Sequence, residues 1–340
     1  MRFIGGKTLI TPYILQFIKE KTTDVESISD VFAGSGAVSR EFKHFGYDVI
    51  SNDLMYFSYV LLRGTIGINS ELVFKYLDVS NPIEYLNHLD LENLNIDISD
   101  CFIYKNYSPK CGRMYFTEKN ALKIDLARIQ IENWYRASII NEDEYFYLLM
   151  CLIEAVPYIS NITGVYGAYL KYWDNRALND LIIKEIELPS NNATGKAYNT
   201  NSNVLIDKIE TDLAYFDPPY NQRQYLPNYH VLETIAKYDN PEIRGLTGLR
   251  DYSEQKSDYC RKDSAFNAFE GLISKTKSRY IVLSYNTEGI LSHDEIISIL
   301  GKYGKKDTLD FKYIDYRRYK NAQTNQNKNL KEVLYFVEKE

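Results

Sequence analysis

The chain has 340 residues, of which 45% are hydrophobic and 25% are charged, values typical of a soluble globular protein rather than a disordered one. No apolar run approaches the roughly 18 to 20 residues that cross a bilayer, so we expect no membrane-spanning segment. Residues 1–7 (MRFIGGK) also lack the long apolar stretch of a secretory signal. The formal net charge of -6 argues against binding nucleic acid by bulk electrostatics, although a basic groove on one face is compatible with it.

The cysteine and histidine content excludes two further classes of protein. The four cysteines, Cys101, Cys111, Cys151 and Cys260, are scattered and form no Cys-x-x-Cys pair, and there are only four histidines. A disulfide framework and a zinc site are therefore not expected. We predict a reduced cytoplasmic protein with buried or half-buried thiols and no metal.

The first part of the chain predicts the opening of a parallel α/β sheet. A helix is expected near Thr11, with Thr11 as its N-cap and Pro12 at its first position. Three elements follow in strand–helix–strand order, over residues 27–32, 37–45 and 47–51. This alternation is typical of parallel sheets covered by helices.

The middle of the chain, residues 71–188, has mostly helical patterns and no clear alternation of strands and helices. Thr117 is a suitable N-cap for a long amphipathic helix that continues to Trp134, and a second helix is expected over residues 142–156. Residues 82–100 carry several acids and no Lys or Arg, which is typical of a solvated acidic face.

The α/β pattern resumes after a predicted linker at residues 191–195. Strands are expected over residues 212–216 and 278–284, and as a terminal antiparallel hairpin over residues 307–316 and 332–337. The predicted fold class is therefore α/β, with a Rossmann-like sheet that ends in an antiparallel hairpin. One discontinuous α/β domain, residues 1–75 and 196–340, is interrupted by a mainly helical insertion, residues 76–195.

The tetrapeptide at residues 217–220 (DPPY) follows an apolar strand directly. Its prolines cannot continue a central strand, so they form a rigid loop at the carboxyl end, where open α/β sheets bind ligands. The Asp217 carboxylate and the Pro218 carbonyl can accept the N–H bonds of an aromatic amino group and stabilise positive charge that develops on its nitrogen. The Tyr220 ring offers a flat surface on which a base can stack.

A glycine-containing turn at residues 30–36 (DVFAGSG) lies between a predicted strand and a predicted helix. Asp53 ends the next strand and is suited to bind the ribose hydroxyls of a nucleoside cofactor. The third glycine of the dinucleotide fingerprint is missing, because Ser39 occupies that position. A nucleoside without a pyrophosphate group therefore fits this turn better than NAD does.

Together these motifs resemble the N6-adenine DNA methyltransferases of the Dam-like alpha group, and in particular the modification enzymes of the FokI and NlaIII types. The segments that carry the resemblance are residues 3–7 (FIGGK), 32–36 (FAGSG), 161–171 (NITGVYGAYLK), 217–220 (DPPY), 224–230 (QYLPNYH), 284–286 (SYN) and 315–319 (DYRRY). It covers nearly the whole chain, although residues 75–155 are only loosely similar to the family.

The resemblance implies a role for each site residue. It implies a catalytic, adenine-holding group of Asp217, Pro218, Pro219 and Tyr220. It implies a site for S-adenosyl-L-methionine made of Lys7, Asp30, Phe32, Ala33, Gly34, Ser35, Gly36, Asp53, Asn203 and Asp217. In this set Asp30 would lie near the methionine end of the cofactor, and Asn203 occupies a position where Dam-like enzymes have an Asp that meets the cofactor adenine. The residues predicted to contact DNA are Arg223, Asn228, Tyr229, His230, Arg244, Arg250, Arg317 and Arg318.

The activity implied is direct methyl transfer to the N6 atom of a flipped-out adenine in double-stranded DNA, without a metal. The enzyme would work in the cytosol and protect DNA in a restriction–modification system, beside a separate cognate endonuclease. Two alternatives stay open. One is cytosine-N4 methylation, which needs the same acceptors, and the other is a DNA-binding paralogue without turnover. Asn228, Tyr229 and His230 could equally cap the next helix.

Overall fold

A computed structural model describes residues 5–189, 191–314 and 331–340, and it confirms the predicted mixed α/β class. The chain forms two compact units. The helical unit contains Met55–Leu188 and Tyr225–Gln255, and the sheet unit contains residues 5–54, Pro189–Gln224 and Lys256–Glu340. The assignment of residues 1–75 and 196–340 to catalysis, and of residues 76–195 to DNA recognition, stays a prediction.

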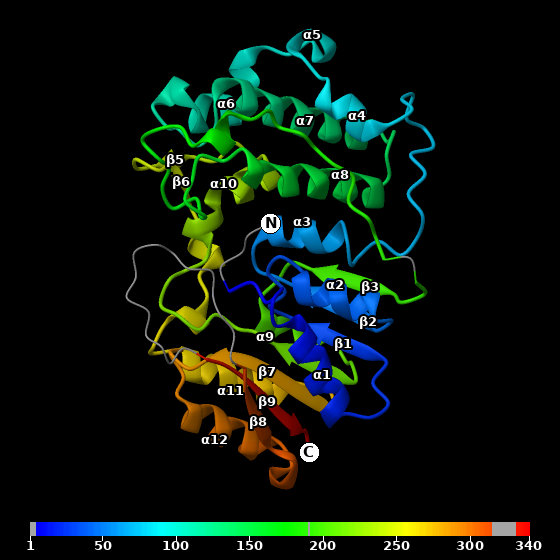
Figure 1. Cartoon of the computed structure of the whole chain (residues 1–340), viewed down its shortest axis with the longest axis vertical. Coiled ribbons are helices and arrows are strands. Elements are labelled where there is room, and N and C mark those ends of the chain that lie inside the picture. The colour runs from blue at the N-terminus through cyan, green and yellow to red at the C-terminus, as the bar shows by residue number, and fades with distance from the viewer. Residues whose placement is uncertain (1–4, 190, 315–330) are drawn as a thin grey trace. The chain divides into compact units, whose positions relative to one another are not determined.

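Seven described strands form the main sheet of the sheet unit, in the order β3-β2-β1-β4-β7-β9-β8. Their bounds are β1 Ser27–Asp30, β2 Asp48–Asn52, β3 Gly195–Tyr198, β4 Leu213–Phe216, β7 Tyr280–Asn286, β8 Asp310–Ile314 and β9 Glu332–Glu338. Strands β3, β2, β1, β4 and β7 are parallel. Strand β9 is antiparallel to both of its neighbours and lies between β7 and β8, so the predicted C-terminal hairpin is confirmed (Figure 1).

Helices cover both faces of this sheet. Helices α1 (Thr11–Lys21) and α2 (Ala37–His44) lie on one face, where the Phe42 ring meets the edge of Tyr215 at 5.7 Å. The other face carries α9 (Ser202–Leu205), α11 (Ala265–Lys275) and α12 (His293–Tyr303). These helices pack with alternate residues of β4, β7 and β9 in one buried cluster. The strands are buried on both faces, as in other mostly parallel sheets.

The structure corrects two local predictions. Helix α1 begins at Thr11, with Ile10 rather than Thr11 as its N-cap, and the Thr11 hydroxyl donates instead to the Lys7 carbonyl at 2.9 Å. The predicted linker runs into β3, which pairs with β2 at the edge of the sheet. The sequence did not predict β3 because this strand (GKAY) is short and only partly buried and has no apolar run.

The helical unit is built from helices α3 to α8 and α10, with one small hairpin. The helix bounds are α3 Tyr56–Arg63, α4 Pro82–Asn87, α5 Leu91–Leu94, α6 Phe102–Tyr107, α7 Glu118–Arg136, α8 Glu142–Ala155 and α10 Leu226–Lys237. Thr117 caps α7 as predicted, since its side chain accepts from the Asn120 amide. The hairpin joins β5 (Ile243–Arg244) to β6 (Leu249–Arg250).

Short 3₁₀ turns occur in both units, over Ile98–Asp100, Pro109–Cys111, Val156–Tyr158, Asn175–Leu178, Ser253–Gln255, Asp258–Cys260 and Lys306–Thr308.

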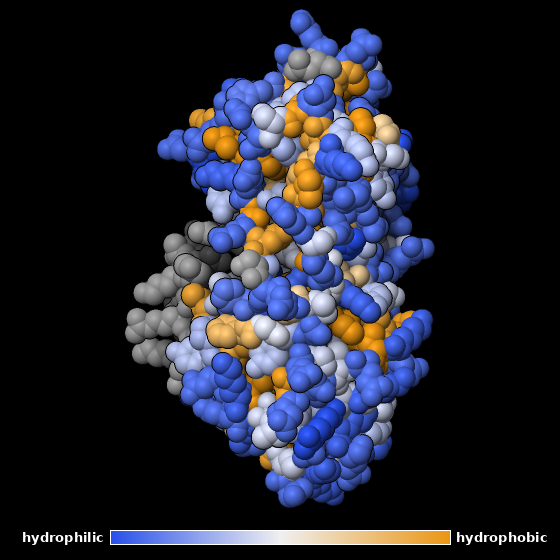
Figure 2. All heavy atoms as spheres, turned by 90° about the vertical axis from the view of Figure 1, so that its right-hand side faces the viewer, coloured by the Kyte–Doolittle hydropathy of each residue, from blue (hydrophilic) through white to orange (hydrophobic). Residues whose placement is uncertain are grey.

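All four cysteines are free thiols; Cys111 is exposed, contrary to the prediction, and the other three are buried. Within the described ranges, no helix has the length and apolar character that a bilayer crossing requires. On the face drawn in Figure 2, hydrophilic residues predominate and hydrophobic residues gather in patches.

Candidate active site

Polar side chains gather on one face of the sheet, near the carboxyl ends of β1, β4 and β7. Paired residues of neighbouring strands share a face, and the register pairs Asp30 with Tyr215 and Asn286 with Glu332. Because Phe216 pairs with Leu283, the next residues along the two strands, Asp217 and Ser284, fall on the opposite face from that pair. This alternation brings acids from β1, β9 and the loop after β4 to one region.

Lys7 links two of these acids. Its Nζ atom lies 2.6 Å from Glu332 Oε1 and 3.0 Å from Asp217 Oδ1. The Ser284 hydroxyl also donates to Glu332 Oε1, at 2.6 Å. Lys7 is only 4% exposed and Glu332 is fully buried. The Lys7 carbonyl accepts from the amides of Ile10 and Thr11 at the start of α1, so the backbone that carries this ammonium group is anchored as well.

Burial and charge shift the proton equilibria of this group in opposite ways. Burial raises the pKa of Asp217 to about 7, against the opposing effect of Lys7, and the negative charge of Glu332 adds to the rise. Burial alone would lower the pKa of Lys7, but Asp217 and Glu332 outweigh it and hold that pKa well above its ordinary value. Lys7 is therefore a buried cation, and it stabilises the ionised form of Asp217.

Tyr220 is held in the same neighbourhood. Its ring is buried, with Lys7 Nζ 5.6 Å from the ring centroid and the Tyr285 ring edge-on at 6.2 Å. The Tyr220 carbonyl accepts from the Ile290 amide at 2.9 Å, so the loop is attached to the segment after β7. Pro218 is buried and Pro219 is half-buried between these anchors. The structure thus brings Asp217, Tyr220 and Lys7 together.

The predicted glycine turn lies between β1 and α2. Gly34 and Gly36 have φ values of 55° and 75°, in the left-handed region that favours glycine. The Gly34 amide donates to Asp53 Oδ2 at 2.9 Å, and the Ala33 amide donates to the carbonyl at the end of β2. Ser35 is buried at the centre of the turn. The turn therefore brings its backbone and the Asp53 carboxylate together.

Asp30 ends β1 beside this turn and is 1% exposed. Its Oδ2 atom accepts from the Ser39 hydroxyl at 2.6 Å, but Oδ1 has no hydrogen-bond partner among the described residues. Burial raises the pKa of Asp30 to about 7, the Ser39 bond opposes this rise, and Asp217 and Asp53 add to it. A buried carboxylate oxygen without a donor fits a cationic ligand group, such as the α-ammonium of a methionine moiety.

Phe32 and Asn203 are engaged by the protein itself. The half-buried Phe32 ring meets the edges of Tyr259 at 5.1 Å and of Phe216 at 6.5 Å. Asn203 accepts from the Tyr259 hydroxyl through Oδ1 and donates to the Ala268 carbonyl through Nδ2, both at 2.7 Å. A contact between Asn203 and a cofactor adenine therefore stays a prediction.

The predicted DNA-contacting arginines lie in different settings. Arg223 is exposed in the sheet unit, and Arg244 is exposed in the helical unit and paired with Glu242 at 2.9 Å. Arg250 is 6% exposed and binds both carboxylate oxygens of Asp239, so a phosphate contact would first have to break that pair. Arg317 and Arg318 lie outside the described residues.

Asn228, Tyr229 and His230 lie inside α10 and do not cap it, because its N-cap is Tyr225. The Tyr229 ring packs on Phe57 at 5.3 Å. The fully buried His230 has Nε2 3.0 Å from the Tyr166 carbonyl, and burial lowers its pKa to about 4. Within the helical unit these contacts are structural. Contact of these three residues with DNA stays a prediction.

Sequence reasoning missed Glu332. The only signal in the sequence is an acid at the head of an apolar strand (EVLYFVE), which by itself is typical of an exposed strand end. Its burial follows from the position of β9 between β7 and β8. Ser284 was noted only as part of a family-like segment, and its bond to Glu332 depends on the same pairing.

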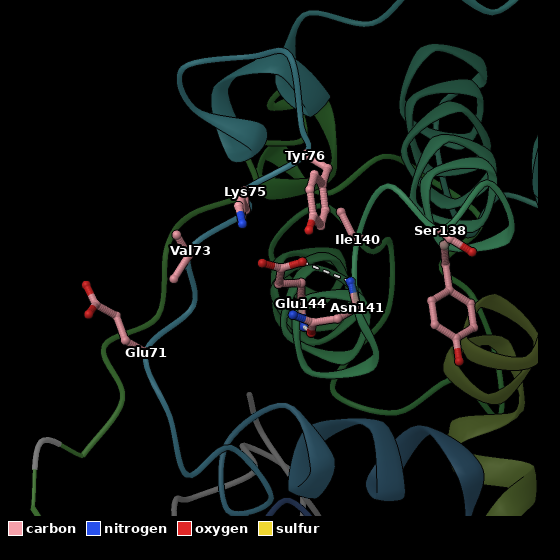
Figure 3. A pocket seen from close by; sticks show the side chains of 9 residues that line it. Glu71, Val73, Lys75, Tyr76, Ser138, Ile140, Asn141 and Glu144 are labelled. Carbon is pink, nitrogen blue, oxygen red and sulfur yellow. Dashed lines mark hydrogen bonds between the residues drawn. The ribbon is translucent and has the colours of Figure 1, made fainter.

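A separate pocket of about 730 Å³ opens in the helical unit (Figure 3). Its walls are Glu71, Val73, Lys75, Tyr76, Tyr135, Ser138, Ile140, Asn141 and Glu144. Glu144 belongs to the capping box of α8, where it accepts from the Asn141 amide. None of the predicted site residues lines this pocket, so it does not bear on the chemistry above.

Across the described ranges, no cluster of three or more His, Cys, Asp or Glu side chains could hold a metal ion.

Comparison with known proteins gives a consistent result. The sequence model of a family described as D12 class N6 adenine-specific DNA methyltransferase matches residues 3–299. The chain is 46% identical over 347 residues to the type II methyltransferase M.FokI of Planomicrobium okeanokoites, covering 100% of the chain and 53% of that protein. It is 40% identical over 343 residues to the modification methylase StsI of Streptococcus sanguinis, covering 100% and 52%. It is 36% identical over 349 residues to the type II methyltransferase M.NlaIII of Neisseria lactamica, covering 100% and 99%. The chain thus spans about half the length of M.FokI and StsI and nearly all of M.NlaIII.

Proposed function

Because the chain belongs to the D12 class of N6 adenine-specific DNA methyltransferases, we propose that it methylates the N6 amino group of adenine in double-stranded DNA. The observation that carries this proposal is the buried group of Lys7, Asp217 and Glu332 beside Tyr220. The methyl donor is S-adenosylmethionine, which supplies an electrophilic methyl group on a sulfonium sulfur.

Asp217 would accept an N–H bond of the adenine amino group. That nitrogen is a poor nucleophile, because its lone pair is delocalised into the ring. It gains positive charge as it attacks the methyl group, and an ionised carboxylate already in place stabilises that charge. Lys7 favours the ionised form of Asp217 and occupies its Oδ1 atom, which leaves Oδ2 for the substrate. Pro218 would contribute its carbonyl as the second acceptor.

The glycine turn and its acids would hold the cofactor. Gly34, Ser35 and Gly36 would line it with backbone atoms, and Asp53 would bind the ribose hydroxyls while it also accepts from the Gly34 amide. The Oδ1 atom of Asp30, which lacks a partner among the described residues, would receive the α-ammonium of the methionine moiety. Phe32 and Ala33 would contact the cofactor from the same turn.

The target adenine must leave the base stack to reach this site, which costs a few kcal/mol. Tyr220 would stack on the flipped base. Arg223 and Arg244, both exposed, are suited to contact phosphates. The relatives include a modification methylase, so we place the enzyme in a restriction–modification system, in which methylation blocks cleavage by a separate endonuclease.

The test is methyl transfer from labelled S-adenosylmethionine to DNA by the wild type and by Asp217→Ala, with Asp207→Ala as the control. Asp207 is an exposed acid of the same unit. We expect Asp217→Ala to lose about 10² to 10³-fold in rate, the range seen when one group that stabilises developing charge is removed. Asp207→Ala should keep the wild-type rate.

Mass spectrometry of the digested DNA identifies the modified base. Label on N6 of adenine supports the proposal, and label on N4 of cytosine would replace it with the other amino-methylation. Wild-type protein that binds DNA without any transfer would indicate a silent binding paralogue.

A further inference from the structure

Glu332 is a fully buried carboxylate at the start of β9, opposite Asn286 of β7. Burying a charge is costly unless it is paired and hydrogen-bonded, so its presence inside the sheet unit requires a reason. Its Oε1 atom accepts from Lys7 at 2.6 Å and from Ser284 at 2.6 Å. Its Oε2 atom has no hydrogen-bond partner in the part of the chain that the structure describes.

We propose that Glu332 is the positioning residue for Asp217: it holds the Lys7 ammonium between two carboxylates, so that Lys7 orients Asp217 without neutralising it. The inference rests on the proposed function, because it specifies how the acceptor of the adenine amino group is kept in place. Glu332 acts only through Lys7, and no contact with the substrate is required of it.

Three contacts restrain the Lys7 ammonium group. Glu332 Oε1 and Asp217 Oδ1 each form an ion pair with Nζ, and the centroid of the Tyr220 ring lies 5.6 Å from it. The shorter of the two ion-pair distances is the one to Glu332. Ser284 in turn keeps Glu332 in place. Without Glu332, the ammonium would be free to move fully onto Asp217 and reduce its strength as an acceptor.

The charge balance favours the same reading. Lys7 carries one positive charge and faces two carboxylates, so the group as a whole can remain negative while Lys7 is protonated. A net negative charge stabilises the positive charge that develops on the adenine nitrogen. A simple Lys7–Asp217 pair would be neutral and would stabilise that charge less.

Several charged or titratable groups interact electrostatically with Asp217 or with its partner Lys7. They are Lys7 before α1, Glu332 of β9, Tyr220 of its own loop, Asp30 of β1 and Tyr215 of β4. Within this set, Lys7 works to lower the pKa of Asp217 and Glu332 works to raise it. Glu332→Gln keeps an oxygen acceptor for Lys7 and Ser284 but removes the charge, so the pKa of Asp217 should fall.

The first experiment measures single-turnover methyl transfer against pH for the wild type, Glu332→Gln and Glu332→Asp. Glu338→Gln is the matched control, because Glu338 lies on the same strand and pairs with Arg279 and Lys305 near the surface. For Glu332→Gln we expect a 10- to 100-fold lower maximal rate, an unchanged KM for DNA, and an acid limb moved down by about one pH unit. Glu332→Asp should restore the position of the acid limb. Glu338→Gln should match the wild type in maximal rate and in the position of the acid limb.

The second experiment needs no activity. The carboxyl carbons of Asp are labelled with ¹³C, the Asp217 signal is assigned by its loss in Asp217→Asn, and its NMR titration is compared in the wild type and Glu332→Gln. A lower midpoint in Glu332→Gln supports the inference even if no DNA is methylated, an outcome that would overturn only the proposed function. If Glu332→Gln does not fold, the same titration with Ser284→Ala tests the link through the hydroxyl, with a shifted midpoint expected. An unchanged midpoint in the variant that folds overturns the inference.

Discussion

The two units of this protein bury carboxylates in opposite ways. In the helical unit, Asp125 is fully buried and accepts from the Ile103 and Tyr104 amides and from the Tyr238 hydroxyl, at 2.6 to 2.9 Å. Glu233 accepts from the amides of Tyr56 and Phe57 at the start of α3. Both oxygens of each acid have donors, and each acid satisfies backbone groups at the start of a helix that would otherwise lack partners.

In the sheet unit, Asp30 and Glu332 are equally buried, but each has one oxygen without a partner among the described residues. Both lie on the face that also carries Asp217, near the carboxyl edge of the sheet, where open α/β sheets bind ligands. Buried polar atoms are nearly always bonded in folded proteins, so these exceptions mark groups arranged for something other than stability. The satisfied acids therefore maintain the fold, and we expect the unsatisfied ones to serve the candidate site.

The largest effect should come from a satisfied acid. Asp125→Ala removes three hydrogen bonds and leaves the two amides at the start of α6 without this acceptor. We expect the free energy of unfolding to fall by about 3 to 5 kcal/mol, measured by urea denaturation. The exposed Asp100→Ala is the control and should change it by less than about 0.5 kcal/mol. A small loss in the free energy of unfolding for Asp125→Ala would contradict the structural role assigned to the buried acids of the helical unit.

The second effect is the pH dependence of stability. Burial raises the pKa of Asp30 from 3.8 to about 7, so between these values the folded protein retains a proton that the unfolded chain releases. The free energy of unfolding therefore falls as the pH rises from about 4 to 7, and Asp30 contributes up to about 4 kcal/mol of that fall. Asp30→Asn should reduce the change of the free energy of unfolding with pH by a comparable amount. The exposed Asp207→Asn should leave that pH dependence unchanged.

The opposite slope is expected from the helical unit. Burial lowers the pKa of His230 from 6.5 to about 4, so the unfolded chain binds a proton there that the folded chain does not. This contribution to stability is lost as the pH falls from about 6.5 to 4, and His230→Asn should remove it. The two variants together separate the opposing slopes. If neither changes the curve measured between pH 4 and 7, the assignment of these groups is wrong.

The third effect concerns ligand affinity. Asp30→Asn replaces the carboxylate by a neutral amide, and the affinity for S-adenosylmethionine should fall about 10- to 100-fold, the size of one charged hydrogen bond. Isothermal titration calorimetry measures this affinity without any turnover. At pH 8 the variant should be at least as stable as the wild type, because it no longer buries an uncompensated charge. A variant that is less stable and binds normally would place Asp30 with the structural acids.

The sequence predicted the parts of this molecule whose signals are local. The apolar strand before Asp217 and the two prolines after it defined β4 and the loop that follows it, because no proline can extend a central strand. Thr117 marked the start of α7 for an equally local reason, since its side chain caps the helix. Strand β3 was missed because an edge strand that is only partly buried needs no apolar run.

The contacts across the sheet could not be predicted in this way. Lys7 and Asp217 were each singled out, but their 3.0 Å ion pair depends on how α1 begins beside the sheet. The burial of Glu332 depends on β9 running antiparallel between β7 and β8, and an apolar strand does not specify its neighbours. Sequence alone therefore predicted individual candidate site residues and left their mutual contacts undetermined.

The smallest effect extends the comparison from acids to arginines. Arg250 of the helical unit is buried and paired with Asp239 through its Nη1 and Nη2 atoms, whereas Arg223 of the sheet unit is exposed. If Arg223 contacts a phosphate, Arg223→Ala should weaken DNA binding a few-fold and reduce the slope of log affinity against log salt by about 0.9. Fluorescence anisotropy with a labelled duplex at several salt concentrations measures that slope.

Arg250→Ala provides the contrast in the same assay. Its guanidinium already compensates a carboxylate, so the salt slope should stay at the wild-type value while the midpoint of thermal unfolding falls. A reduced slope for Arg250→Ala and an unchanged one for Arg223→Ala would reverse the assignment. In that case the Arg250–Asp239 pair opens when DNA binds, and pairing in the free protein would no longer separate structural groups from those that serve the site.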